Sequence, residues 1–228
     1  MAKIGIIAAL DCEINKYIAD FSAERMDNGF MYAGSFAGHE LYLTLCGVGK
    51  VNAAICTQRL IDLVHPDILI NSGVAGGVSD KLHICDLAIS DSLTYHDFYP
   101  IDVLDKYAPG RSVFPADEKL VELAVRAANE YHKTEPHFRY LVGKIISGDQ
   151  FIEDKQKVLA FRDTYNALCT EMEGAAVAHT AYANRVPFIV MRTISDNADE
   201  NADMSFTEMA AIAAERVSFI VKEMIRLY

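Results

Sequence analysis

Short apolar runs rich in β-branched residues alternate along the chain with longer segments of helical periodicity, and this alternation constrains the fold more than any other feature. The apolar runs end at Gly, Asn or Asp. Strands this short and this apolar are usually buried on both faces of a mostly parallel sheet. We therefore expect an α/β fold formed by a single domain over residues 1–228, a length that one hydrophobic core can serve.

The expected elements follow from where each pattern starts and stops. Strands are predicted over 3–9, 30–36, 41–46, 67–71, 86–90, 141–146, 167–170 and 188–194. A helix is predicted over 50–64, because His65 precedes a proline and is pushed out of helical geometry. Its apolar stripe consists of Ala53, Cys56, Leu60, Leu63 and Val64.

The last helix and the longest loop complete the pattern. Ser205 and Glu208 form a capping box, which predicts a helix start ahead of the final apolar stripe. Outside that stripe, Met209, Ile212 and Phe219 are compatible with a subunit contact. The segment 99–115 contains three prolines and little periodicity, so it is predicted to be a long surface loop.

Charge and cysteine content exclude several classes of partner. The net charge of −11 repels nucleic acid and anionic lipid, which leaves a small molecule or a second copy of the chain as the expected partner. The apolar runs are too short for a membrane-spanning helix. Five cysteines without a C-x-x-C spacing are typical of reduced thiols in a cytoplasmic protein, so neither a disulfide nor a zinc site is expected.

Two stretches resemble ligand-binding motifs but lack residues that those motifs require. The GVGK stretch at 47–50 lacks the earlier glycine and the following Ser or Thr of a phosphate-binding loop. The acidic spacing at 199–203 resembles a calcium loop, but Met204 and Ala210 stand where that loop needs Gly and Glu. No metal site is expected.

Acidic side chains instead follow the predicted strands at the edge where α/β sheets bind ligands. Taken alone, Glu13 fits the first turn of a helix and Asp196 fits a turn. Glu171 and Glu173 are harder to explain, because they lie between an apolar strand and a run of small residues, where an unpaired carboxylate is costly. Carboxylates that converge on one crevice suit cleavage of a glycosidic bond, which needs an acid for the leaving group and a base for water.

Six segments together carry a family resemblance. They are KIGIIAALDCEI (3–14), NSGVAGG (71–77), DLAISDSLTYHD (86–97), ISGDQFI (146–152), TEMEGAAVAH (170–179) and RTISDNAD (192–199). The combination resembles the 5′-methylthioadenosine/S-adenosylhomocysteine nucleosidases of the nucleoside phosphorylase family. The resemblance implies a three-layer α/β/α sandwich around a mixed sheet. It also implies a homodimer that hydrolyses adenine from 5′-thioadenosines, and from 5′-deoxyadenosine, with water and without a cofactor or metal.

The resemblance also implies roles for individual residues. By motif position, Asp196 protonates nitrogen 7 of the leaving adenine with Ser195 orienting it, and Glu13 activates the attacking water. Glu173 holds the ribose hydroxyls beside Met172. The remaining implied residues are Phe151 stacked on the purine, Ile152 reading its edge through the backbone, Val74, Ala75 and Gly76 in the substrate pocket, and Arg192 and Glu171 in support. Val74 replaces a serine common in relatives, so a hydroxyl that could position water is missing.

Three alternatives remain beside this interpretation. A phosphorylase of the same superfamily would need arginines around phosphate, whereas NSGVAGG at 71–77 brings none and the first strand ends in acids. Hydrolysis is therefore favoured. A hydrolase of futalosine-type nucleosides shares the adenine-side chemistry and stays open. A non-catalytic nucleoside-binding module would have little use for Glu13 as a water-activating acid.

Overall fold

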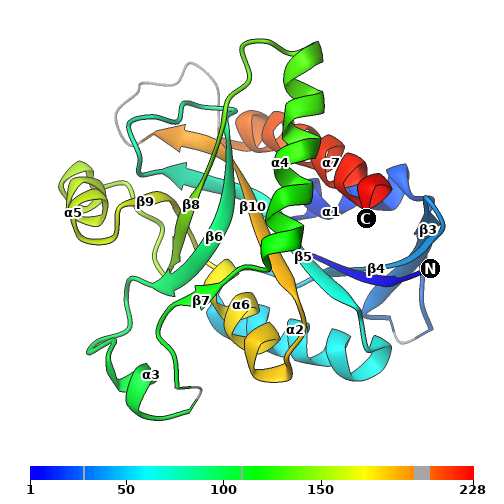
Figure 1. Ribbon diagram of the computed structural model, residues 1–228, viewed down its shortest axis with the longest axis horizontal. Helices are drawn as coiled ribbons and strands as arrows, with labels where there is room; N and C mark the ends of the chain where they lie inside the picture. The colour runs from blue at the N-terminus through cyan, green and yellow to red at the C-terminus, as the bar shows by residue number, and fades with distance from the viewer. Residues whose placement is uncertain (28, 109, 198–205) are drawn as a thin grey trace.

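The computed structural model describes residues 1–27, 29–108, 110–197 and 206–228, and in this part of the chain one mixed sheet lies between helices (Figure 1). The strands are β1 (Lys3–Ala8), β2 (Glu24–Arg25), β3 (Met31–Phe36), β4 (His39–Leu45), β5 (Ile68–Gly77), β6 (Leu87–Tyr95), β7 (Phe114–Pro115), β8 (Tyr140–Ser147), β9 (Ala167–Glu171) and β10 (Phe188–Asn197). The helices are α1 (Asp11–Asp20), α2 (Lys50–Val64), α3 (Val103–Lys106), α4 (Glu118–Thr134), α5 (Lys155–Tyr165), α6 (Gly174–Asn184) and α7 (Phe206–Leu227).

Helices cover both faces of the sheet, which confirms the predicted three-layer α/β/α architecture. Successive side chains of β1 point to opposite faces of the sheet, so this strand contributes to the cores on both faces. Ile4 and Ile6 belong to the core beneath α1, α4 and α7, whereas Ile7 belongs to the core beneath α2 and α6. In Figure 1, α2 and α6 lie together below the sheet, while α4 and α7 lie on its other side.

The sheet closes partly on itself because β5 changes partner along its length. Ile68 to Asn71 of β5 pair with β1, and then Gly76 and Gly77 pair with β9 on the same edge. The other edge of β5 pairs in parallel with β10. Strands β5, β10, β6, β8 and β9 therefore form a closed ring, from which β1, β4, β3 and β2 extend. The expected mixed sheet is present, and this ring is a feature that the sequence pattern did not predict.

Helix α2 has the predicted bounds, whereas β5, β6 and β10 run several residues further than predicted. β5 continues to Gly77 and β10 to Asn197, so the residues expected in loops beyond these strands lie on the strands themselves. Two side chains were placed wrongly: Leu63 is 58 % exposed, because it lies on the outer face of α2, and Met209 is buried at 8 % exposure, because it packs inward from α7.

The segment 99–115 is not entirely irregular, since it contains α3 and β7. Ser205 of the capping box and the acidic spacing at 199–203 lie outside the described residues. Among the helices that the structure describes, none has both the length and the apolar character needed to cross a membrane.

Candidate active site

The ends of β1, β5, β9 and β10 surround a hollow with about 200 Å³ of interior space, at the edge where α/β sheets bind ligands. Glu13, Glu173 and Asp196 all line it, although they are far apart in the sequence. The other predicted residues in the lining are Val74, Ala75, Gly76, Phe151, Ile152, Glu171, Met172 and Ser195. Residues of the lining that were not predicted are Ala9, Leu10, Val48, Gln150 and Thr170.

Glu13 is held by backbone amides on both of its carboxylate oxygens. It is the third residue of α1, and its Oε2 accepts hydrogen bonds from the N–H groups of Ala9 (2.9 Å) and Leu10 (3.0 Å). Its Oε1 accepts one from the N–H of Val74 in β5 (2.9 Å). Burial raises the pKa of Glu13 above its ordinary value, although the nearby Arg192 and the three amides oppose the rise.

Gly73 allows Glu13 and Arg192 to approach the same stretch of β5. The parallel register of β5 and β10 pairs Gly73 with Arg192. A Cβ at position 73 would lie 2.7 Å from Arg192 Nη1 and 2.8 Å from Glu13 Cδ. A side chain of any size would therefore displace one of these groups.

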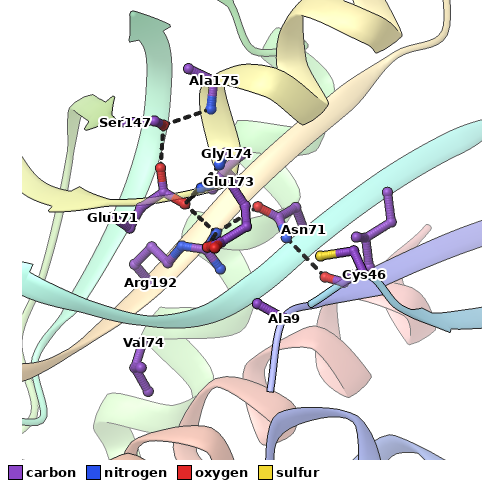
Figure 2. A network of polar contacts seen from close by, with 12 residues as sticks. Ala9, Cys46, Asn71, Val74, Ser147, Glu171, Glu173, Gly174, Ala175 and Arg192 are labelled. Carbon is purple, nitrogen blue, oxygen red and sulfur yellow. Dashed lines mark hydrogen bonds and ion pairs between the residues drawn. The ribbon is translucent and has the colours of Figure 1, made fainter. Parts of the chain in front are cut away.

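Arg192 lies behind the hollow in a network of buried polar groups (Figure 2). Its Nη2 donates to Glu171 Oε2 (2.5 Å) and to Asn71 Oδ1 (2.7 Å), and Asn71 Nδ2 donates in turn to the carbonyl of Ile7 (2.9 Å). Burial alone would lower the pKa of Arg192, but the neighbouring carboxylates raise it, so the guanidinium stays charged.

Glu171 uses its remaining hydrogen-bonding capacity to fix the start of α6. Its Oε2 accepts from the N–H groups of Glu173 (3.0 Å) and Gly174 (2.7 Å), and its Oε1 accepts from the Ser147 hydroxyl. Ser147 Oγ accepts from the N–H of Ala175 (2.7 Å). Figure 2 shows these contacts meeting at the helix N-terminus. Together, Glu171 and Arg192 therefore fix the segment that carries Glu173.

Glu173 is buried at the N-cap position of α6, and its carboxylate reaches across to α2. Its Oε1 accepts from the N–H of Gly49 (2.9 Å), while its Oε2 lies 3.7 Å from Arg192 Nη2. Burial and the neighbouring Glu171 carboxylate raise the pKa of Glu173, against the influence of Arg192 and the Gly49 amide. A polar ligand that donates hydrogen bonds to this carboxylate would therefore be bound favourably.

Asp196 lies half-buried on β10 beside Ser195. The Ser195 hydroxyl donates to Asp196 Oδ1 (2.8 Å), which leaves Oδ2 without this partner. A Cβ on Gly76 would lie 3.3 Å from Oδ2, so the glycine keeps this oxygen accessible. Burial raises the pKa of Asp196 above its ordinary value, although the Ser195 hydrogen bond lowers it. The acid form is therefore available at higher pH than for an exposed aspartate.

The opposite wall has an aromatic side chain on a short loop. Phe151 is 60 % exposed at the mouth, whereas the adjacent Ile152 is buried against Val158 and Phe161 of α5. The ring of Phe151 is therefore accessible in the lining of the hollow, while Ile152 anchors the loop.

Asn71, Ser147 and the amide of Gly49 are parts of the site that sequence reasoning missed. Asn71 and Ser147 follow buried apolar runs, and a polar residue at such a position is a usable signal. Nothing in the sequence marks the Gly49 amide. Among the described residues, no group of three or more His, Cys, Asp or Glu side chains is arranged to hold a metal ion.

Comparisons with known proteins give one consistent result. A family model described as the phosphorylase superfamily matches residues 3–226. The 5′-methylthioadenosine/S-adenosylhomocysteine nucleosidase of Haemophilus influenzae (strain PittEE) is 37 % identical, with 98 % of each chain covered. The crystal structure of the nucleosidase of the same name from Neisseria meningitidis, in complex with methylthio-immucillin-A, is similar with a TM-score of 0.88 and 32 % identity over 100 % of both chains. Futalosine hydrolase of Helicobacter pylori is also similar, with a TM-score of 0.86 and 30 % identity over 100 % of this chain and 98 % of that one.

Proposed function

The chain belongs to the phosphorylase superfamily, among its 5′-methylthioadenosine/S-adenosylhomocysteine nucleosidases, and from this membership we propose that it hydrolyses the N-glycosidic bond of both nucleosides and releases adenine. The observation that carries the proposal is the meeting of Glu13, Glu173 and Asp196 in the lining of one hollow. We include 5′-deoxyadenosine among the expected substrates, since it has the same base and ribose.

Asp196 acts as the acid in the proposed reaction. As the C1′–N9 bond breaks, its electron pair moves into the adenine ring, and the Oδ2 proton of Asp196 passes to nitrogen 7. Two features support this role: burial raises the pKa of Asp196, and Ser195 hydrogen-bonds to Oδ1, which leaves Oδ2 to carry the proton. Proton transfer by a placed acid is typically worth about 10²- to 10⁴-fold in rate.

Glu13 acts as the base. Water attacks C1′ of the oxocarbenium-like ribosyl group and gives one proton to Glu13, so the C1′–O bond forms as adenine leaves. Two of the three amides occupy Oε2 and only one occupies Oε1, so Oε1 has an acceptor site free for the water proton. Its raised pKa makes Glu13 a better proton acceptor than an exposed carboxylate.

Glu173 and Phe151 bind the substrate from two sides. The Glu173 carboxylate accepts hydrogen bonds from the ribose hydroxyls beside Met172, and the Phe151 ring stacks on the purine while the backbone of Ile152 reads its edge. Val74, Ala75 and Gly76 form the floor on β5. Removing any of these contacts would weaken substrate binding more than the chemical step.

Water is favoured over phosphate as the nucleophile. None of the described residues that line the hollow is an arginine or a lysine. Arg192 lies behind the lining and is already paired with Glu171 and Asn71. A phosphate beside the Glu13 carboxylate would therefore lack the cations that it needs.

A futalosine-type nucleoside is the second candidate substrate, because a futalosine hydrolase has nearly the same fold as this chain. Its adenine-side chemistry would use the same Asp196 and Phe151. The two assignments differ only in the group attached at the 5′ position.

We further propose a cytoplasmic homodimer in which the partner's 99–115 segment completes the 5′ pocket. Val51, Ile55 and Leu63 form an exposed apolar row on α2, and Tyr99 is 95 % exposed. All five cysteines are free thiols, as is usual in the cytoplasm. Sedimentation of the protein as a 25.2 kDa monomer at micromolar concentration would contradict the dimer.

The deciding experiment follows adenine release from methylthioadenosine in phosphate-free buffer, with S-adenosylhomocysteine, 5′-deoxyadenosine and aminodeoxyfutalosine as parallel substrates. We expect adenine and the free thiosugar in equal amounts. Release that requires added phosphate would establish a phosphorylase, and a strong preference for aminodeoxyfutalosine would establish the second candidate.

The acid role is tested with Asp196→Asn, which keeps the shape but carries no carboxyl proton. We expect kcat to fall by at least about 100-fold. The matched control is Asp117→Asn at the N-cap of α4, where asparagine caps equally well. Unchanged turnover of Asp196→Asn would remove this residue from the acid role.

A further inference from the structure

Lys50 links two walls of the hollow without contacting it, and we propose that it is a positioning residue for substrate binding. This inference rests on the proposed function, since it concerns the walls that hold Glu173 and Phe151. The lysine belongs to the GVGK stretch at 47–50, which resembles a phosphate-binding loop but lacks the rest of that motif.

The Lys50 ammonium joins two carboxylates from different segments. Lys50 Nζ lies 2.5 Å from Asp97 Oδ1, just after β6, and 3.5 Å from Asp149 Oδ2, in the loop after β8. The side chains of Lys50 and Asp97 are only 20 % and 16 % exposed, so this pair is shielded from solvent more than an ordinary surface ion pair. Asp97 Oδ2 also accepts from the N–H of Asp149 (2.8 Å).

The position of this lysine in its own helix is locally unfavourable. Lys50 is the first residue of α2, where the helix dipole disfavours a cation. A locally unfavourable residue often has a compensating role in the fold or the site. Here the cation lies close to both Asp97 and Asp149 and reduces the repulsion between their like charges. Burial would raise the pKa of Asp97, but the hydrogen bonds from Lys50 and Asp149 lower it below its ordinary value.

The N-terminus of α2 is capped by residues of both walls. The N-cap residue is Gly49, which has no side chain that could accept hydrogen bonds from the first amides of the helix. Instead the N–H of Lys50 donates to Asp149 Oδ1 (2.8 Å), and the N–H of Gly49 donates to Glu173 Oε1 (2.9 Å). Gly49 has a φ of 101°, and a Cβ there would lie 3.3 Å from Asp149 Oδ1, so the close approach needs glycine.

Displacing Asp149 would therefore disturb both walls at once. Asp149 precedes Gln150 and Phe151, which line the hollow, and it caps the helix whose Gly49 amide orients Glu173. α2 and α6 also pack directly against each other, so a shift of one helix would displace the other. Without the ammonium, the two aspartates repel, so the backbone hydrogen bonds that remain hold the purine-stacking loop and the ribose-binding carboxylate less firmly.

The position of these contacts predicts which kinetic constant changes. Phe151 and Glu173 contact the substrate in the ground state and in the transition state alike, so loosening them raises KM with little change in kcat. A merely structural lysine would instead lower the amount of folded enzyme, which reduces the apparent kcat and leaves KM unchanged.

The test compares Lys50→Met, which keeps the length of the side chain, with Lys50→Arg, which keeps the charge. We expect Lys50→Met to raise KM for methylthioadenosine about tenfold with kcat within about threefold of the wild type. Lys50→Arg should have a KM for methylthioadenosine close to that of the wild type. The control is Lys133→Met, which breaks an exposed ion pair with Glu130 on α4 and should leave both constants unchanged.

Hydrogen exchange of the free protein provides a second measurement that needs no substrate. Lys50→Met should speed amide exchange in 47–50 and 148–152 but not in α4. Unchanged KM together with unchanged exchange in these two segments would overturn the proposal, as would an equal effect of Lys133→Met. Absence of adenine release by the wild type would refute the proposed function, and the exchange result would still decide whether Lys50 holds the two segments.

Discussion

Substitution of Gly73 by alanine is the sharpest test of the catalytic geometry. The new Cβ would lie 2.7 Å from Arg192 Nη1 and 2.8 Å from Glu13 Cδ, whereas ordinary contacts begin near 3.4 Å. Arg192 must therefore retreat by about 0.7 Å and Glu13, whose Oε1 lies nearest to the new Cβ, by about 1 Å, or the strand must move by a similar distance. Arg192 is fixed by its buried partners Glu171 and Asn71, and Glu13 can move toward the hollow only by stretching the amide hydrogen bonds that hold its carboxylate.

The size of the effect follows from this displacement. A misplacement of about 1 Å at a reacting group costs on the order of 100-fold, so we expect kcat/KM to fall between about 10- and 100-fold. The loss should fall mainly on kcat, because in the proposed reaction Glu13 acts on the attacking water and not on substrate binding. Overpacking should also lower the free energy of unfolding by about 1 to 3 kcal/mol.

Adenine release at saturating and at limiting methylthioadenosine separates kcat from KM, and urea unfolding gives the stability. The control is Gly143→Ala on β8, where the Cβ meets the Leu168 side chain at 3.1 Å, away from the carboxylates. It should lose stability but keep kcat. If Gly73→Ala keeps kcat/KM within about threefold of the wild type, the close approach of Glu13 and Arg192 is not required for catalysis.

Two further predictions concern the acid and the buried ion pair. Ser195→Ala removes the hydrogen bond that lowers the pKa of Asp196, so the pKa rises and the protonated form persists to higher pH. The alkaline limb of the pH profile of kcat/KM should shift to higher pH, and a shift to lower pH would contradict the assignment of that limb to Asp196. Glu171→Gln deprives the buried Arg192 of its closest counter-charge, so we expect the free energy of unfolding in urea to fall by about 3 kcal/mol. Glu130→Gln, which breaks an exposed pair with Lys133, should cost less than about 1 kcal/mol, and equal losses would show that the buried pair has no special weight.

The fold class could be predicted from the sequence because the local signals agree with the tertiary structure. Helix α2 has its predicted bounds, since Gly49 and the His65 to Pro66 step mark its ends. α6 lacked such a signal. It is buried on most sides, from Gly174 to Ala178 and at Ala181, so its sequence shows no apolar stripe.

The length of β5 could not be predicted, because its second half has the composition of a loop. Gly, Asn and Ser have low strand propensity, yet residues 71–77 pair with β10, and Gly76 and Gly77 also pair with β9. This pairing overrides propensity, and it joins segments that are distant in the sequence. The ring that it closes has no signature in any single segment.

The acidic side chains of the candidate site could be predicted from the sequence, whereas its backbone donors could not. Glu13, Glu173 and Asp196 were predicted to converge, and the structure places all three in the lining of one hollow. Their proposed roles remain to be tested. The amide of Gly49 could not be predicted, because a backbone donor has no residue type to mark it.

The three amides that hold Glu13 have a consequence for how this pocket can change. Val74 contributes its N–H to the carboxylate, while its side chain is free to differ. Ala9 and Leu10 do the same from the start of α1. Mutation can therefore vary the side chains around Glu13, and with them the shape of the pocket, while every backbone donor that orients its carboxylate is retained.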